Sequence, residues 1–204
     1  MERAADAAIL GRKPRLSVGE RAGLELLAAT DPDARVRSVA LGALVHAGPR
    51  RTTARVWRLA AADPDAAVRR RVAELAPALG NAASSRALLA LLADAEPLVA
   101  EAAAFALGEH APASAQAVAA LGRAATTHDD ALVREAAVAA LGALGDPASL
   151  TFVLAACDDK PAVRRRAVLA LAAFDGEEVE ARLALALEDR DWQTRQAAEQ
   201  LLEA

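Results

Sequence analysis

Apolar residues recur along the chain with the spacing of one helix face, and the same pattern returns at nearly even intervals. In each copy an anchor residue is followed by apolar residues four, seven and eight positions later. This spacing places them on one side of an α-helix. The evenly spaced anchors are Val36, Val68, Val99, Val133, Val163 and Thr194. The pattern predicts six buried helix faces in a repeated unit.

Start and stop signals flank these helices. Three positions before each anchor we expect an N-cap that accepts hydrogen bonds from the free N–H groups of the first turn. The row is Asp33, Asp65, Glu96, Asp130, Lys160 and Asp191. Pro97 and Pro161 follow at the first helical position, where the missing N–H costs nothing. Glycines after most of the apolar faces supply helix stops.

A less sharply patterned helix precedes each of these turns. The segments are 19–30, 54–62, 85–93, 115–125, 148–156 and 178–187. Two helices per unit divide residues 19–204 into six pairs, at about 19–48, 49–80, 81–110, 111–145, 146–176 and 177–204. Residues 1–18 are predicted to form a short helix, about Arg3 to Leu10, and a basic segment, GRKPRLS. That segment either folds over the first pair or stays mobile.

The repeated segments resemble a known family. DDALVREAAVAALGALGDP at 129–147, with DPDARVRSVALGAL at 31–44 and DPDAAVRRRVAELAPALG at 63–80, is similar to HEAT repeats of the short type named after phycobilisome lyases. The resemblance covers about residues 19–204. It implies an all-α fold, an α-solenoid in the form of a right-handed superhelix of about six hairpins, with the second helices on the concave side. The Trp and Tyr positions of tetratricopeptide repeats and the T-P-L-H turn of ankyrin repeats are absent.

The resemblance also implies a ladder of Asp and Arg side chains between neighbouring repeats. Arginine directly follows the anchor in five of the six copies. Five positions before the anchor, five of the six copies have an aspartate and the other copy has His128. Units that contact only their neighbours need such polar ties. We therefore expect a structural role for Asp31, Arg37, Asp63, Arg69, Arg134, Asp158, Arg164, Asp189 and Arg195.

Positions two and six after each anchor point away from the buried face and are expected to line the groove. The candidate partner-binding residues are Ser38, Arg70, Glu74, Glu101, Phe105, Glu135, Arg165, Leu169 and Gln196. Their charges alternate in sign, with Phe105 and Leu169 as an apolar spot. A protein segment suits this surface better than a phosphate backbone, which requires Lys or Arg in nearly every repeat. The alternative is that these positions are merely solvated. The triplets Arg69–Arg71 and Arg164–Arg166 can each seat an acidic side chain or a phosphate.

Composition supports helices and restricts the partners. Hydrophobic residues make up 54% of the chain but aromatic residues only 2%, which favours helices packed through Ala, Leu and Val. Residues 1–60 hold 11 Lys and Arg against 6 Asp and Glu, a net +5, whereas residues 61–204 hold 13 against 22, a net −9. The single Cys157 rules out an internal disulfide and suits a reducing compartment. Without an apolar stretch of membrane-spanning length, we expect a cytoplasmic protein that needs no membrane. A monomer is expected, with the oligomeric state left open.

Motifs that carry chemistry are missing from the sequence. It has no Gly-rich phosphate loop and no H-E-x-x-H, and its one reversed pair, Glu109-His110, contrasts with the repeated His-Glu pairs of HEAT-like iron hydroxylases. The three histidines fall at helix ends or turns, where an exposed or capping role is expected. We therefore predict no catalytic, cofactor-binding or metal-binding residue, and a non-enzymatic scaffold that binds a protein.

Two alternatives stay open at this point. One is a nucleic-acid-binding or DNA-repair glycosylase-like protein that uses the basic segment 1–60, with Trp57 and Trp192 as its large aromatic side chains. The other is a bilin lyase-like activity, suggested by the repeat type alone. A shared repeat does not carry a shared chemistry, so neither alternative displaces the scaffold.

Overall fold

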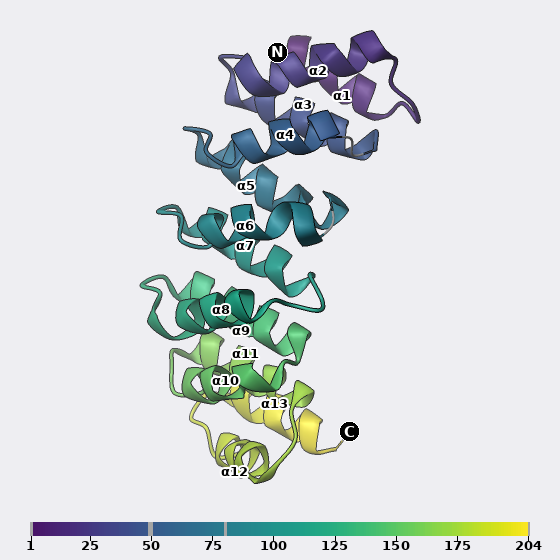
Figure 1. The fold of residues 1–204 in the computed structure, drawn as a ribbon. Coiled ribbons are helices and arrows are strands. Elements are labelled where there is room, and N and C mark those ends of the chain that lie inside the picture. Colours follow the sequence, from purple (N-terminus) through teal and green to yellow (C-terminus); the bar gives the residue numbers. More distant parts are fainter. Residues whose placement is uncertain (1, 49–50, 80, 204) are drawn as a thin grey trace. The chain divides into compact units, whose positions relative to one another are not determined.

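The computed structural model describes residues 2–48, 51–79 and 81–203, with the side chains of 51 and 81–84 left undescribed. Across these ranges the chain forms thirteen α-helices and three short 3-10 segments, and no strand (Figure 1). The prediction of an all-α fold is confirmed. The helices alternate in pairs as the repeat pattern predicts.

The helix pairs follow one leading helix, α1 (Glu2–Gly11). The first helices of the pairs are α2 (Val18–Thr30), α4 (Arg51–Ala60), α6 (Asn81–Leu91), α8 (Ala115–Thr127), α10 (Leu150–Ala156) and α12 (Glu177–Ala186). The second helices are α3 (Ala34–His46), α5 (Ala66–Leu75), α7 (Pro97–Gly108), α9 (Ala131–Leu144), α11 (Pro161–Ala170) and α13 (Trp192–Leu202). The 3-10 segments are Ala76–Leu79, Pro147–Ser149 and Leu171–Ala173.

The chain divides into two compact units, Met1–Ala106 and Leu107–Ala204. In the first unit α3 packs against both α1 and α5, and in the second α11 packs against both α9 and α13 (Figure 1). The second helices of each unit therefore form a row. Since α1 lies beside α3, it takes the place of a second helix at the start of the first row.

The basic segment after α1 is tied to the next helix. Ser17 and Glu20 form a capping box at the start of α2, in which each side chain accepts a hydrogen bond from the backbone N–H of the other residue. Lys13 forms an ion pair with the same Glu20 carboxylate. The hydrogen bonds from Lys13 and Ser17 lower the pKa of Glu20 to about 2. The segment thus runs across the N-terminus of α2.

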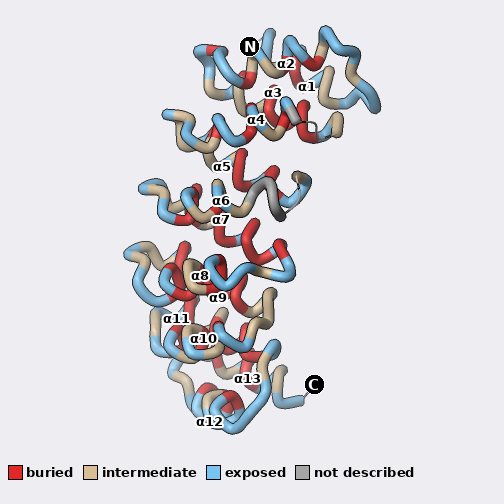
Figure 2. The backbone as a smooth tube through the Cα atoms, in the orientation of Figure 1, coloured by how far each residue is buried: buried red, intermediate tan, exposed pale blue. Residues whose placement is uncertain are grey.

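The anchor residues form the core of each unit. All six are at most 1% exposed, as the repeat pattern predicts. Buried stretches alternate with exposed ones along the helices (Figure 2). Trp57 is completely buried beside the anchors and donates from Nε1 to the carbonyl of Val72 at 2.9 Å. The last pair differs from the expected pattern, because Leu201 is half-buried and Leu202 is 53% exposed. No neighbouring helix covers that end of α13 among the described residues.

Glycines let neighbouring second helices approach closely in the second unit. A Cβ placed on Gly142 of α9 would lie 2.7 Å from the Cβ and 2.9 Å from the Cα of Ala170 in α11. A Cβ on Gly108 would meet Ala140 of α9 at 2.9 Å. Atoms at these distances overlap, so the spacing of the row depends on the missing side chains.

Most of the expected N-caps are present. Asp33, Asp65, Asp130 and Asp191 each accept a hydrogen bond from a backbone N–H of the first turn. The expectation for Lys160 is wrong, because an ammonium group has no lone pair to accept a bond. The preceding carboxylate, Asp159, accepts from the backbone N–H of Lys160 at 2.6 Å instead.

Arginine and aspartate side chains connect successive turns within each unit. The Nε and Nη2 groups of each arginine donate to the two carboxylate oxygens of an aspartate 25 or 26 residues further on, at 2.6–2.9 Å. The pairs are Arg37–Asp63, Arg69–Asp94, Arg134–Asp159 and Arg164–Asp189. The remaining Nη1 donates to backbone carbonyls of the turn before the arginine's own helix. Each guanidinium therefore holds two turns together, and we call these four pairs the turn-to-turn pairs.

The fifth repeat corrects one expectation. Arg134 pairs with Asp159 and not with Asp158, which was expected to take part in the ladder. The interval from Val133 to Val163 is the shortest of the five between successive anchors. Because the spacing from arginine to carboxylate is kept, the carboxylate falls one place nearer the anchor. Asp158 instead accepts from Arg182 and is 76% exposed.

The leading helix and the middle of the chain depart from this pattern. Asp31 is paired with Arg3 of α1, at 3.0 Å, so α1 supplies the arginine that a preceding second helix would provide. Arg195 donates to the carbonyl of Asp189 in the turn before its own helix. In the third repeat Ala100 stands at the arginine position, and in the fourth His128 stands at the aspartate position. An arginine–aspartate pair at this place therefore lacks both of its partners. The boundary between the two units falls in the repeat of Ala100.

The turn-to-turn pairs shift the titration of their carboxylates. The guanidinium groups of Arg69, Arg134 and Arg164 hold the pKa values of Asp94, Asp159 and Asp189 below the ordinary range. A carboxyl group with a lower pKa in the folded state stabilises the fold above its unfolded pKa, and this contribution is lost as the pH falls through the folded value.

We expect the free energy of unfolding to change little between neutral pH and about pH 5, and to fall steeply below about pH 4, where unfolded aspartate takes up a proton. Urea denaturation followed by circular dichroism at a series of pH values measures this. In Asp189→Asn one such group is removed, so the acid slope becomes shallower. A variant with an unchanged slope would contradict the assignment.

Asp158 and Asp159 provide a matched pair of substitutions. We expect Asp159→Asn to lower the free energy of unfolding by about 2–4 kcal/mol, because it leaves the largely buried Arg134 without its carboxylate. Asp158→Asn, which affects an exposed pair, costs less than about 1 kcal/mol. Chemical denaturation of both variants tests this, and equal losses would count against the structural role of the turn-to-turn pairs.

Candidate functional site

The sequence-predicted binding residues lie on the second helices. Arg70, Glu74, Phe105 and Gln196 are exposed, and Ser38, Glu101, Glu135, Arg165 and Leu169 are half-buried. Phe105 has the largest apolar side chain of this set and is 65% exposed. Several of the charged members are paired: Arg70 with Glu74 at 3.0 Å, and Glu135 with Arg166 at 3.4 Å. The faces of the second helices are therefore of mixed polarity in both units.

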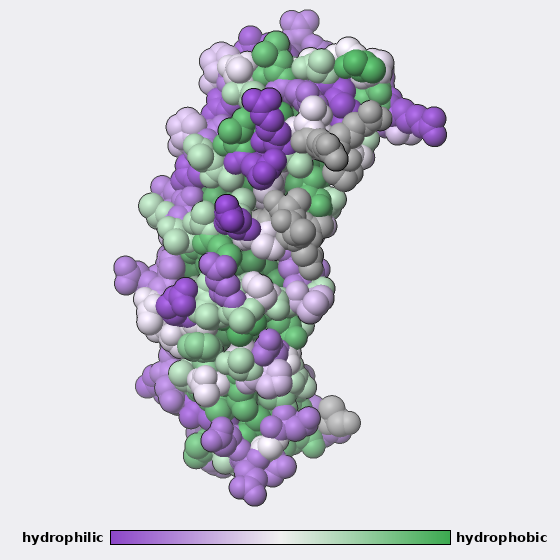
Figure 3. All heavy atoms as spheres, viewed as in Figure 1, coloured by the Kyte–Doolittle hydropathy of each residue, from purple (hydrophilic) through white to green (hydrophobic). Residues whose placement is uncertain are grey.

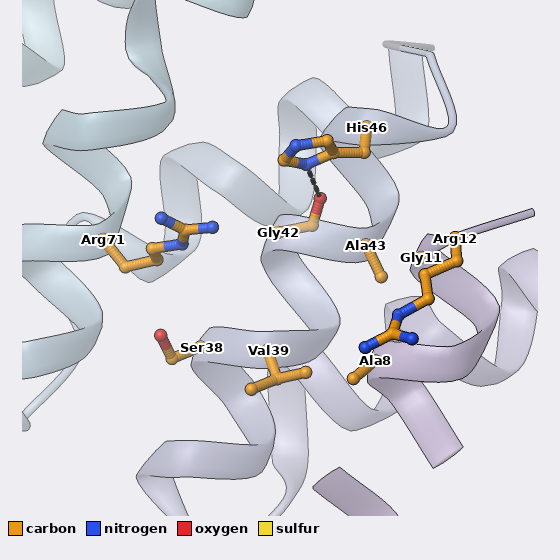
Figure 4. A pocket seen from close by; sticks show the side chains of 9 residues that line it. All are labelled: Ala8, Gly11, Arg12, Ser38, Val39, Gly42, Ala43, His46 and Arg71. Atoms are coloured by element: carbon orange, nitrogen blue, oxygen red, sulfur yellow. Dashed lines mark hydrogen bonds between the residues drawn. The ribbon is translucent and has the colours of Figure 1, made fainter. Parts of the chain in front are cut away.

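The first unit has a hollow of about 530 Å³ between α1, α3 and α5 (Figure 4). Small and apolar residues form its floor and walls: Ala8, Gly11, Val39, Gly42 and Ala43. The polar groups that line it are Arg12, Ser38, His46 and Arg71. We call this space the basic hollow, because three of its four polar side chains are basic.

Close packing of α1 on α3 shapes one side of the basic hollow. A Cβ on Gly11 would lie 3.0 Å from the Cβ of Ala43 and 3.1 Å from its Cα. On the other side, Arg71 extends from α5 over Gly42, with Nη2 3.0 Å from the place of a Gly42 Cβ. This cover explains why Gly42, which position six places on the outward face, is buried.

The polar groups of the basic hollow differ in their bonding. Nδ1 of His46 donates to the carbonyl of Gly42 at 2.9 Å, so Nε2 is the nitrogen left for other contacts. Arg71 forms an ion pair with Glu74 at 3.0 Å, and the same carboxylate also forms an ion pair with Arg70. No side-chain hydrogen bond or ion pair joins Arg12 to another described residue. The hollow thus contains cationic groups that are only partly neutralised.

The second unit has a smaller hollow, of about 310 Å³, along α9 and α11. Its lining is almost entirely small or apolar: Ala139, Gly142, Ala143, Leu169, Ala170, Ala172 and Ala173. Arg166 is its single basic side chain, and this arginine already contacts Glu135. We call this space the apolar hollow.

Ser38 and Leu169, which were expected to line a groove, lie at the hollows, and so do Gly42 and Ala139 at position six after their anchors. Sequence reasoning missed Arg12, His46 and the rest of the floor of the basic hollow. Arg71 belongs to an arginine triplet noted above as able to seat an acidic group. The signal for Arg12 was the small pair Ala8 and Gly11 on the leading helix, which matches the small faces of the second helices. That signal becomes meaningful only once α1 is known to lie beside α3.

The other residues considered for chemistry are dispersed. Within the described ranges, no group of three or more His, Cys, Asp or Glu side chains is placed to hold a metal ion. His128 accepts from the backbone N–H of Asp130, a capping role. His110 differs from the expectation of an exposed or capping histidine, because its side chain is enclosed at 5% exposure and burial lowers its pKa. Trp57 is buried in the core and Trp192 is 60% exposed.

Within the described residues, no helix combines the length and the apolarity that crossing a lipid bilayer requires.

Helix pairs packed on their neighbours in rows define the class of α-solenoid repeat proteins. A sequence model of HEAT repeats matches residues 22–108 and 85–162, which together make up more than half of the chain. The chain therefore belongs to the HEAT-repeat family. No curated protein sequence matches it.

Solved structures share this fold at low sequence identity. The X-ray structure of Escherichia coli YibA has a TM-score of 0.72 and 19% identity, covering 97% of this chain and 74% of that one. A designed armadillo repeat protein in complex with the peptide (KR)4 has a TM-score of 0.60 and 15% identity, covering 90% and 98%. Human deoxyhypusine hydroxylase has a TM-score of 0.51 and 22% identity, covering 98% and 78%. These similarities show the fold alone.

Gly42 and Gly142 allow a matched test of the packing that shapes the two hollows. We expect Gly142→Ala to lower the free energy of unfolding by about 1–3 kcal/mol, because the new Cβ overlaps Ala170. Gly42→Ala meets the end of the flexible Arg71 side chain, so it is neutral or stabilises by up to about 1 kcal/mol through helix propensity. Thermal denaturation of both variants measures this, and a tolerated Gly142→Ala would contradict the close helix approach.

Proposed function

We propose that this protein is a non-enzymatic scaffold or adaptor that binds a protein segment on the faces of its second helices. The observation that carries the proposal is the open, mixed surface of those helices, with Phe105 exposed and Leu169 at the edge of the apolar hollow. Apolar anchors surrounded by polar groups are typical of protein-binding surfaces. The designed armadillo protein, solved with a peptide, supports the suitability of such a fold for extended segments.

The charge distribution on the second helices disfavours nucleic acid as the partner. Acidic residues stand among the candidate positions of both units, as Glu74, Glu101 and Glu135. A phosphate backbone would meet repulsion at these positions. We therefore infer a protein partner, and a cytoplasmic monomer remains the accompanying proposal.

The enzymatic alternatives have weaker support from the residues. A structural neighbour, human deoxyhypusine hydroxylase, is named as an enzyme, but its identity to this chain is 22%. His46 ends α3, and His110 and His128 lie in two different connections between helices. The lyase interpretation depends on the type of repeat alone. A role without catalysis, cofactor or metal is the proposal that needs the fewest added assumptions.

We expect binding to depend on one apolar residue in each unit. Affinity capture from the native cell with the tagged protein, followed by quantitative mass spectrometry, should identify partners that survive moderate salt. Phe105→Ala combined with Leu169→Asp should reduce their recovery by about tenfold, equivalent to about 1.4 kcal/mol.

The first helices offer a matched control for this experiment. Leu59 and Leu185 are 61% and 65% exposed there, as open as Phe105. Hydrophobic and hydrophilic residues are interspersed on the face of the molecule that Figure 3 shows. Leu59→Ala with Leu185→Asp should leave recovery unchanged. If the second-helix variant retained every partner, or the control lost them equally, the proposal would fail. Capture of DNA or RNA with a steep salt dependence would favour the nucleic-acid alternative.

A further inference from the structure

We propose that the basic hollow is a seat for the carboxylates of an acidic protein segment, rich in Asp and Glu, with Arg12 and Arg71 as the main contacts. The inference rests on the proposed function and gives the partner a chemistry. The hollow lies entirely in the first unit, between α1, α3 and α5, and all its lining residues are described.

The shape of the basic hollow suits the end of a side chain. Its volume of about 530 Å³ lies within the range of about 300–1,000 Å³ that is usual for ligand sites. Gly42 leaves room below Arg71, because a Cβ there would lie 3.0 Å from Nη2 of this arginine. Val39 and Ala8 provide an apolar wall for the methylene groups of an incoming glutamate. The carboxylate of the glutamate can then reach the basic groups while its methylene groups pack against the apolar wall.

The basic groups approach this space from different elements. Figure 4 shows Arg71 of α5 on one side of α3 and Arg12, just after α1, on the other. His46 lies at the end of α3 with Nδ1 already donating to Gly42. Guanidinium groups bind carboxylates with two parallel hydrogen bonds. Two arginines on opposite sides of one hollow therefore favour a segment with more than one carboxylate.

Glu74 already shows how Arg71 meets a carboxylate. Its two oxygens contact Arg70 and Arg71, each at 3.0 Å, and its side chain is 36% exposed. Ion pairs this open to solvent are weak, so a carboxylate held in the hollow by further contacts can displace Glu74 from Arg71. Glu74 would then be a competitor, and its removal should strengthen binding.

Acidic residues near the basic hollow favour an acidic peptide over a nucleic-acid backbone as its ligand. Along the same unit the next second helices carry Glu74 and Glu101 at the outward positions. A continuous chain of phosphates would pass these carboxylates, whereas a peptide can present acidic side chains to the hollow and neutral ones beyond it. The charge of +5 on residues 1–60 would also draw an acidic segment toward this end.

The apolar hollow provides the internal comparison. It is built in the same way, from Ala139, Gly142 and Ala143 of a second helix with one arginine from the next. That arginine, Arg166, contacts Glu135, and the lining has no second basic residue. The two hollows thus share a construction but differ in charge, so the proposal requires acid binding in the first and not in the second.

The test uses the full-length protein and a fluorescein-labelled peptide, (DE)4, with (NQ)4 as the uncharged control. Fluorescence anisotropy should show binding of (DE)4 and none of (NQ)4. Arg12→Ala with Arg71→Ala should weaken binding by at least about tenfold, and Glu74→Gln should strengthen it by about threefold. Arg166→Ala removes an arginine from the apolar hollow and should change the affinity by less than about twofold. Circular dichroism confirms that the variants fold.

Two results would contradict the proposal that the basic hollow binds carboxylates. One is a loss with Arg166→Ala as large as with the double variant, which would indicate general attraction to positive charge. The other is displacement of (DE)4 by single-stranded DNA or inorganic phosphate at concentrations where free glutamate-rich peptide fails, which would indicate a phosphate site.

Different results would contradict the carboxylate-binding proposal and the scaffold proposal. If (DE)4 does not bind but Phe105→Ala with Leu169→Asp still releases the captured partners, the seat is wrong and the scaffold stands. If (DE)4 binds through Arg12 and Arg71 while that variant retains every partner, the seat stands and the wider role of the second-helix faces is wrong.

Discussion

The bidentate bond between an arginine and the aspartate of the following turn is the interaction on which the rest of this structure depends. Two nitrogens of the guanidinium bind the carboxylate, and the third binds carbonyls of the turn before it. The same carboxylate accepts a backbone N–H of its own turn, as Asp63 does from Asp65. Each bond therefore fixes two turns and the start of a second helix at once. With the turns held, the helices can approach through small residues alone, as Gly142 and Ala170 do.

Close approach through small residues has a functional result, because it leaves hollows between the second helices. The basic and apolar hollows have the same kind of floor, yet the first is lined by Arg12, His46 and Arg71 and the second by Leu169 and a paired arginine. A few outward side chains on a common frame thus decide what each unit can hold. The common frame defines the family, whereas individual side chains determine which partner each unit can bind.

The parts of the fold that follow from local chemistry could be predicted from the sequence. The six anchors, the helix pairs and the caps at Asp33 or Asp130 depend on residues a few positions apart. The exchange of Asp158 for Asp159 could not be foreseen, because a slightly shorter repeat changes which carboxylate comes within reach of Arg134. The burial of Gly42 and the role of Arg12 depend on neighbours from other helices. Periodicity within one helix carries no information about such contacts.

The spacing of the turn-to-turn pairs has a further consequence for how the chain reaches this structure. Each arginine of the turn-to-turn pairs binds an aspartate 25 or 26 residues later, so the chain closes only short loops to form these bonds. The entropy lost in closing a loop grows with its length, and proteins whose contacts are close in sequence fold fast. Any adjacent helix pairs can serve as a starting point from which order spreads to the next. A chain of this kind can acquire its structure progressively while it emerges from the ribosome.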